Sequence, residues 1–383
     1  TTLAELEVAM TTAAREVRPD VLTVIRERAF DTNDATDLGN DASYARDDEG
    51  LLRLWDVPVP SALEGMRRAS ADDWLQRIAM LKYARGVDRG RVMVASGSGV
   101  SDWDARLALG TAFAVRASPW ELRVGVPQAS VGRELRTGAF AWAREHLPAI
   151  QAARSAARVL VVQSSSSRDL VDFGYGSGTF STFLAPQTGV GGPHVRPDES
   201  WFAESPSDGS GALEAVGELR GIVKALVHLH VPFDILPAEK ISAESLSGYR
   251  LVFAPDVVAT TDVCALAIRE HAERGGVVLS TGLRPWTFDE VGRERPELAV
   301  GDLFGTKKRE PVGVDASSTK GAATHVESLV GRRYLRYGDG LALDVIRSQV
   351  ERANAGLIAT NAPRDVWFDL LETDEELFLS VVN

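Results

Sequence analysis

Short apolar runs alternate with helical stretches along most of this chain, and this alternation is the feature that most restricts its fold. Clear examples of the runs are RVLVVQS from Arg158, PFDIL from Pro232 and GVVLSTG from Gly276. Each run is short and rich in Val, Leu and Ile, which is typical of a strand buried on both faces. Strands that alternate with helices in this rhythm predict an α/β fold built on a parallel sheet.

The pattern is clearest in residues 156–310, where it predicts a doubly wound, flavodoxin-like sheet. The strand RVLVVQS is followed by a Ser, Gly and Pro-rich insertion up to about Gly211, which we expect to be a surface excursion. A strongly periodic helix, ALEAVGELRGIVKALVHLH, then leads to PFDIL and to a further strand, RLVFAPDVV. The next helix begins at the Thr/Asp cap of TTDVCALAIREHAERGG and ends at Gly275.

Residues 1–155 predict a smaller parallel α/β unit. Four candidate strands alternate with helices there, in the segments DVLTVI, ASYAR, RVMVASGSG and FAVRASPW. A closed (β/α)8 barrel takes eight strands and about 250 residues, so only half a barrel fits. Two interpretations stay open: the C-terminal half of a barrel whose first half lies elsewhere, or an open α/β layer that is complete in itself.

Beyond Phe304 the pattern changes, and residues 311–383 predict the start of a β-rich domain. We expect short strands with tight turns in four segments, RRYLRYGDG, GLIATNA, VWFDLLET and ELFLSVVN. The final strand would leave an open sheet edge at the end of the chain.

Length, charge and cysteine content limit the number of domains, the classes of binding partner and the cellular compartment. Three hundred and eighty-three residues, at about 150 per domain, predict at least two folding units. A net charge of −12 disfavours nucleic acid and anionic membrane surfaces, because phosphates repel an acidic protein. No apolar segment is long enough for a membrane span. The single cysteine, Cys264, cannot form an internal disulfide, so we expect a reducing compartment, the cytoplasm.

The segment from Leu219 to Gly305 resembles the domain that follows the barrel in β-galactosidases with a trimerisation domain. The residues that carry the resemblance are a helix, the strands HVPFDIL and LSGYRLVFAP, the run ERGGVVLSTG, a following DEVG and a closing LAVGDLFG. That domain has a class I glutamine-amidotransferase-like fold. The flanking segments fit in order, with a barrel end before and a β-rich domain after. The resemblance implies a glycoside hydrolase architecture and a homo-oligomer, with a trimer as the suggested form.

The resemblance also implies where the catalytic carboxylates should be. Such enzymes cleave O-glycosidic bonds with two carboxylates that flank the bond. The acid/base would lie in a missing N-terminal half, and the nucleophile should end the strand RVMVASGSG. Ala95, Ser96 and Gly97 stand at that position instead of a glutamate. The nearest carboxylates are in the acidic cluster after ASYAR, where we expect the carboxyl end of a strand, the place where barrel enzymes keep their chemistry.

From this cluster we predict Glu49 and Asp48 as the catalytic carboxylates, although a solvated acidic loop is the simpler interpretation. Trp103 and Trp120 are candidate stacking platforms for a sugar, with core packing as the alternative for each. Asn40 and Asp41 are candidates to bind sugar hydroxyls, with a role as helix caps as the alternative.

No cofactor or metal is expected. The glycines at 97–99 lack the rest of a dinucleotide fingerprint. Cys264 lies inside a predicted helix, with His271 two turns along, so it reads as a buried apolar residue rather than an amidotransferase nucleophile. His228 and His230 are two residues apart and point to different faces, which disfavours a metal site.

The sequence therefore leaves two hypotheses. The first is a glycoside hydrolase related to β-galactosidases, with a carbohydrate substrate. The second is a catalytically inactive sugar-binding or assembly protein that retains the glycosidase architecture. The Ala95-Ser96-Gly97 run favours the second hypothesis, whereas the acidic cluster and the tryptophans favour the first.

Overall fold

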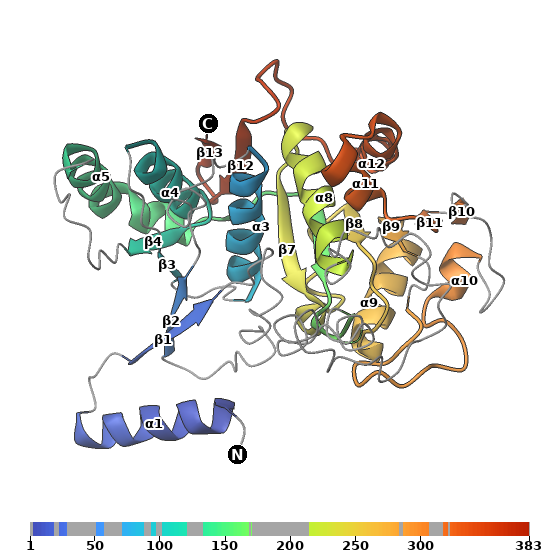
Figure 1. Ribbon diagram of the computed structural model, residues 1–383, viewed down its shortest axis with the longest axis horizontal. Coiled ribbons are helices and arrows are strands. Elements are labelled where there is room, and N and C mark those ends of the chain that lie inside the picture. Colours follow the sequence, from blue (N-terminus) through green and yellow to red (C-terminus); the bar gives the residue numbers. More distant parts are fainter. Residues whose placement is uncertain are drawn as a thin grey trace, which may run out of the picture.

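The described part of the chain folds into three sheets with their helices (Figure 1). The computed structural model describes residues 3–18, 23–28, 51–56, 71–87, 93–96, 102–120, 133–167, 170, 214–282, 286–305, 317–320 and 322–382.

The first sheet is parallel, with the strand order β1-β2-β3-β4. Its strands are β1 (Thr23–Arg28), β2 (Leu51–Asp56), β3 (Met93–Ser96) and β4 (Ala117–Trp120). The helices of this part are α1 (Leu3–Val17), α3 (Ala71–Val87), α4 (Asp102–Ala114) and α5 (Arg133–Ala152). Three of the strands match the prediction. The remaining one, β2, is LLRLWD, and the predicted strand ASYAR lies outside the described residues.

The second sheet has six strands in the order β10-β11-β9-β8-β6-β7. All its pairs are parallel except β10 with β11. The strands are β6 (Val159–Gln163), β7 (Phe233–Pro237), β8 (Leu251–Ala254), β9 (Val277–Thr281), β10 (Ser317–Lys320) and β11 (Ala323–Val326). Counted from β6, the parallel strands follow the order 2-1-3-4-5, which is the order of flavodoxin-like doubly wound sheets.

Helices cover both faces of the second sheet. On one face lie α8 (Glu214–His228), α11 (Val330–Tyr337) and α12 (Gly340–Arg352), and α3 joins the same core. On the other lie α9 (Asp262–Glu273) and α10 (Gly301–Phe304). A short 3-10 helix, η4, covers Ala238–Lys240. Alternate residues of β6, β8 and β9 enter opposite cores, so both faces of these strands are apolar and they read as continuous hydrophobic runs.

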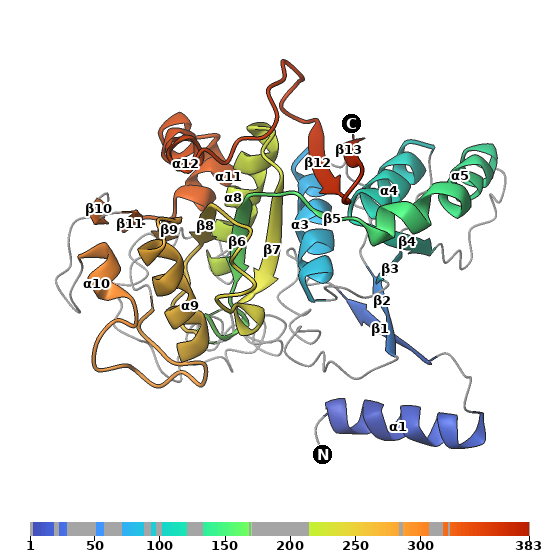
Figure 2. The ribbon, with the colours of Figure 1, turned by 180° about the vertical axis from the view of Figure 1, so that it is seen from behind.

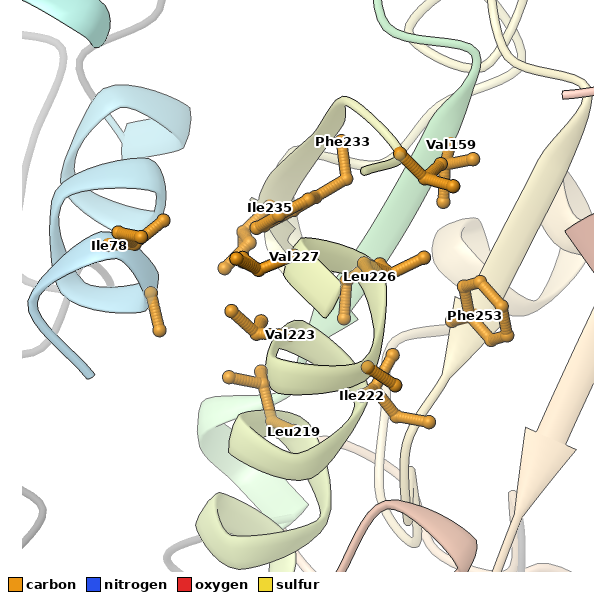
Figure 3. Packing of buried hydrophobic residues seen from close by; sticks show 14 of the residues in the cluster. Ile78, Val159, Leu219, Ile222, Val223, Leu226, Val227, Phe233, Ile235 and Phe253 are labelled. Atoms are coloured by element: carbon orange, nitrogen blue, oxygen red, sulfur yellow. The ribbon is translucent and has the colours of Figure 1, made fainter. Parts of the chain in front are cut away.

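The larger core joins the first part of the chain to the second sheet. Figure 3 shows Ile78 of α3 pointing toward Val227 of α8 and Ile235 of β7, and all three side chains are fully buried. On the far side of α8, Ile222 and Leu226 face the strands. Because α3 contributes to this core, the first part of the chain is attached by a continuous hydrophobic contact and not by a linker alone.

The third sheet is antiparallel and pairs the C-terminal strands with a strand from the middle of the chain. It has the order β13-β12-β5, with β5 (Arg154–Ser155), β12 (Trp367–Glu372) and β13 (Leu377–Val382). The strands predicted in VWFDLLET and ELFLSVVN are confirmed. In Figure 2, β12 and β5 lie beside α3, between the other two sheets.

The predicted strand in RRYLRYGDG is wrong, because these residues belong to α11 and the start of α12. GLIATNA lies outside any helix or strand, and β11 pairs with β9 of the second sheet. The described residues after 311 are therefore not uniformly β-rich. Within the described ranges, every helix is too short or too polar to cross a bilayer.

Candidate functional site

The carboxyl edge of the first sheet brings four strand-terminal residues into one row. β1 ends at Arg28, β2 at Asp56, β3 at Ser96 and β4 at Trp120. The backbone register pairs Arg28 with Asp56, Asp56 with Ser96, and Ser96 with Trp120. Parallel α/β sheets bind their ligands at this edge, because loops from neighbouring strands converge there. This row, which we call the carboxyl-edge row, is the candidate functional site.

Asp56 is the carboxylate of this row, and the sequence prediction missed it. The position at which the family resemblance implies a glutamate is occupied by Ala95 and Ser96 in β3. Asp56 is the direct backbone neighbour of Ser96 on the adjacent strand, at an inter-strand spacing of about 4.8 Å. A signal was present in the sequence, since the short run LLRLW is followed directly by Asp56, two residues before the turn-forming Pro58.

Trp103 and Trp120, the two predicted sugar platforms, have backbone positions near this edge. Trp120 is the last residue of β4 and is in register with Ser96. Trp103 lies in the first turn of α4, the helix that follows β3. The structure therefore brings these two positions to the same end of the sheet as Asp56.

The remaining predicted site residues, Asn40, Asp41, Asp48 and Glu49, lie outside the described residues, as do the glycines at 97–99. The prediction for Asp48 and Glu49 assumed that a strand ends just before them. The described strand nearest to them in sequence is β2, which begins after them at Leu51. Its six residues extend about 17 Å, from Leu51 at the amino edge to Asp56 at the carboxyl edge. The catalytic roles of Asp48 and Glu49 stay predictions.

A buried ionic cluster lies where α3 meets the two other sheets. The Lys82 Nζ of α3 donates to both carboxylate oxygens of Asp369 on β12, each at 2.7 Å. It also lies 3.4 Å from Oδ1 of Asp234 on β7. The Tyr249 hydroxyl donates to the other oxygen of Asp234 at 2.9 Å. Sequence reasoning did not find this cluster, because its members are scattered along the chain.

Two carboxylates share Lys82, and their pKa values move apart. Burial raises the pKa of Asp369 to about 6, and repulsion by Asp234 adds to the rise, although Lys82 and Arg116 oppose it. Burial also acts to raise the pKa of Asp234. The Lys82 charge and hydrogen bonds from Ser155 and Tyr249 outweigh that burial and hold the pKa below its usual value.

Glu218 of α8 is a further buried carboxyl group, and it accepts a hydrogen bond from the amino end of the neighbouring helix α11. Its Oε2 accepts the backbone N–H of Arg332 at 2.8 Å, in the first turn of that helix. Burial raises the pKa of Glu218 to about 7, against the hydrogen bonds from the backbones of Arg332 and Gly331. Oε1 of Glu218 is buried without a hydrogen-bond partner. The carboxyl group is thus a costly structural contact inside the protein, and not an exposed catalytic acid.

The flavodoxin-like sheet does not carry an amidotransferase nucleophile at Cys264. This residue is fully buried inside α9, and its N–H is capped by the Thr261 hydroxyl at 3.1 Å, as predicted. Burial raises the pKa of the thiol to about 12, so it stays protonated at neutral pH. The interpretation of Cys264 as a buried apolar residue is confirmed.

The two histidines at the end of α8 have separate environments, as predicted. Nδ1 of His228 lies 2.7 Å from the Tyr334 hydroxyl, whereas Nε2 of His230 lies 3.2 Å from the carbonyl oxygen of Pro363. Across the described ranges, His, Cys, Asp and Glu side chains form no group of three that could hold a metal ion.

Comparison with known proteins shows a fold and leaves the activity open. No protein-family model matches the chain, and no curated protein matches it. Among solved structures, it is similar to the β-galactosidase from Bacillus circulans sp. alkalophilus, with 14% identity and a TM-score of 0.65 over 98% of this chain and 60% of that chain. The β-galactosidase from Rahnella sp. R3 gives 14% identity and a TM-score of 0.63, over 95% of this chain and 59% of that one.

A catalytic mutant of a GH42 β-galactosidase from G. stearothermophilus is also similar, with 12% identity and a TM-score of 0.62 over 94% of this chain and 58% of that chain. The chain thus spans about 60% of the length of the solved structures it matches. These similarities show that the chain shares the fold of these β-galactosidase structures over the matched part of their length.

Proposed function

We propose that this chain is part of a glycoside hydrolase that cleaves O-glycosidic bonds at the carboxyl-edge row of the first sheet. The observation that carries the proposal is the combination of a β-galactosidase-type fold with an aspartate and a tryptophan in register with Ser96 at that edge. Glycosidases place two carboxyl groups beside the scissile bond, one to protonate the leaving oxygen and one to attack or to activate water. Asp56 is a candidate for one of these groups.

The acidic residues predicted from the sequence remain the other candidates. Glu49 and Asp48 precede Leu51 at the amino edge of β2, so a catalytic role for either would require a substrate site that reaches that end of the sheet. Trp103 and Trp120 would stack against sugar rings, because an indole offers a flat apolar face and a polar N–H. Asn40 and Asp41 would hydrogen-bond to sugar hydroxyls.

A second carboxylate would come from strands that complete a barrel. Among the described residues, the first sheet has four parallel strands, half of the eight that a closed (β/α)8 barrel needs. The chain also spans only about 60% of the proteins it matches. We therefore propose that a missing N-terminal half of the same protein supplies the other strands and the acid/base. The second sheet would act as the trimerisation-type domain, and sedimentation equilibrium would test whether the protein forms a trimer.

The alternative is a catalytically inactive sugar-binding or assembly protein. It is favoured by Ala95 and Ser96 in β3, where the family resemblance implies a glutamate. Without that carboxylate, a retaining enzyme loses the group that forms its covalent intermediate. Such a protein would bind sugars through the tryptophans without cleaving them.

Hydrolysis of a panel of nitrophenyl glycosides separates the two functions. For the enzyme, Asp56→Asn or Glu49→Gln should lower kcat by about 100-fold or more, whichever of them is catalytic, and Asp344→Asn on the exposed face of α12 should leave it unchanged. The assay needs the longest reading frame that contains this chain. Absence of hydrolysis in that full protein, together with saturable sugar binding, would establish the alternative.

A further inference from the structure

Lys82 lies at the meeting point of three elements that are far apart in sequence. Its ammonium group contacts Asp369 of β12 at 2.7 Å and Asp234 of β7 at 3.4 Å. The rings of Phe233 and Trp367 lie 5.8 and 5.9 Å from the same nitrogen. One side chain of α3 is therefore bonded to both of the other sheets.

The cluster is sealed from solvent. The side chains of Lys82 and Asp369 are 3% and 1% exposed, and that of Asp234 is 14% exposed. Inside a protein a charge is stable only if it is compensated, and here two carboxylates depend on Lys82. The other cation that acts on both is Arg116, which follows α4. The docking of α3 on the two other sheets is thus tied to the ionisation of these groups.

We propose that the Lys82, Asp234 and Asp369 cluster is a pH-sensitive lock, which holds α3 and the first sheet against the rest of the protein more tightly in mildly acidic than in neutral solution. The titrating group is Asp369. In the docked state its carboxyl group is buried beside Asp234, whereas in an undocked state it would be solvated.

The direction of this pH dependence follows from the difference in the pKa of Asp369 between the docked and undocked states. Burial and Asp234 raise the pKa of Asp369 to about 6 in the docked state, above the ordinary value near 4. The docked state therefore binds a proton more readily, and docking weakens as the pH rises through 6. For a pKa that rises from about 4 to about 6, the docking equilibrium falls by about tenfold between pH 5.0 and pH 7.5.

Other groups that face the cluster titrate differently. The pKa of Asp234 is held below its usual value, so this residue stays ionised throughout that interval. His230 packs on the neighbouring Phe368 with ring centroids 5.1 Å apart, and burial lowers its pKa. Its effect on stability has the opposite sign, because protonation of a buried histidine costs free energy as the pH falls. A variant at Asp369 is needed to separate the two.

Hydrogen exchange of the full 383-residue chain tests the lock. Protection factors, which correct for the intrinsic pH dependence of exchange, are compared at pH 5.0 and 7.5 for the amides of α3 and β12. In the wild type they should fall by about tenfold over this interval. In Asp369→Asn this fall should be lost, whereas Glu372→Gln, on the same strand in a surface ion pair with Arg154, should retain it.

If Asp369→Asn fails to fold, the triple variant Lys82→Met/Asp234→Asn/Asp369→Leu serves instead. Replacement of a whole buried cluster by uncharged groups is tolerated better than removal of one partner, and this variant should show no fall in the protection of α3 between pH 5.0 and 7.5. Equal protection at both pH values in the wild type would overturn the proposal. So would a fall of the same size in Asp369→Asn, since this result would assign the effect to a group other than Asp369.

Discussion

Gly221 of α8 and Gly331 of α11 bring the backbones of their two helices into direct contact. A β-carbon on Gly221 would overlap the carbonyl group of Gly331, and one on Gly331 would overlap the carbonyl oxygen of Glu218. This close approach also places the Glu218 carboxylate at the amino end of α11, where it accepts the Arg332 N–H. The position of α11 thus depends on two small residues and one buried acid.

We therefore expect Gly221→Ala to lower the free energy of unfolding by about 1–3 kcal/mol, which is the usual cost of overpacking. The control is Gly217→Ala on the same helix, where a β-carbon would lie 3.9 Å from the Arg332 side chain. That change should be neutral or stabilising by up to about 1 kcal/mol, because alanine is the better helix former. Urea denaturation measures both, and equal effects of the two substitutions would contradict the packing argument.

Glu218 should make stability depend on pH near neutrality. Burial raises its pKa in the folded protein to about 7, so its ionisation costs folding free energy as the pH rises through that value. The stability of Glu218→Gln relative to wild type should increase by about 2 kcal/mol between pH 5 and pH 8. Chemical denaturation at the two pH values measures this difference. The exposed Glu351→Gln on α12 is the control, and an unchanged difference for Glu218→Gln would place its pKa outside this interval.

Lys82→Met should be strongly destabilising, by about 3–5 kcal/mol, because it leaves Asp369 and Asp234 without their shared buried cation. The comparison is Arg154→Met, which also breaks an ion pair to β12 but at an exposed position, 3.0 Å from Glu372. Thermal unfolding should show a large shift in Tm for the first variant and none for the second. Similar shifts would mean that burial does not decide the strength of these pairs.

Cys264 should not react with thiol reagents in the native protein. The residue is fully buried, and burial raises the pKa of its thiol to about 12. Labelling by a maleimide at pH 7.5 should therefore proceed only through opening of the structure, and it should become fast in denaturant. Mass spectrometry of the labelled protein measures the rate. Fast labelling without denaturant would show that α9 opens readily.

Much of the second sheet was predictable because its signals are local. RVLVVQS, PFDIL and GVVLSTG became β6, β7 and β9, since a continuous apolar run can satisfy its burial only inside a sheet covered on both faces. The cap at Thr261 and the end of α9 before Gly275 are also local, because they depend on one hydroxyl and on one left-handed residue.

The strand predicted in RRYLRYGDG was wrong because contacts with distant residues stabilise a helix there. Tyr334 and Tyr337 favour a strand by propensity, yet the segment is helical. Two distant contributions from α8 outweigh that preference: the cap from Glu218 and the close approach at Gly221. No window along the sequence contains either contact.

Part of the candidate site was likewise predictable from local sequence, and part of it depended on contacts between strands. Trp103 and Trp120 could be proposed from the sequence because each lies beside a strand that the pattern predicts. Asp56 was missed because β2 carries an arginine within its short apolar run, and its role depends on register with Ser96 across the sheet.

By itself, then, the sequence determined the α/β class, the strands β6 to β9 with the helices α8 and α9, the C-terminal hairpin and the inert burial of Cys264, because each depends on burial or capping within a short segment. The tertiary structure alone decided the row through Asp56, the helix at α11 and the joining of three sheets at Lys82. These depend on groups between roughly 40 and 290 positions apart, which only long-range packing brings into contact.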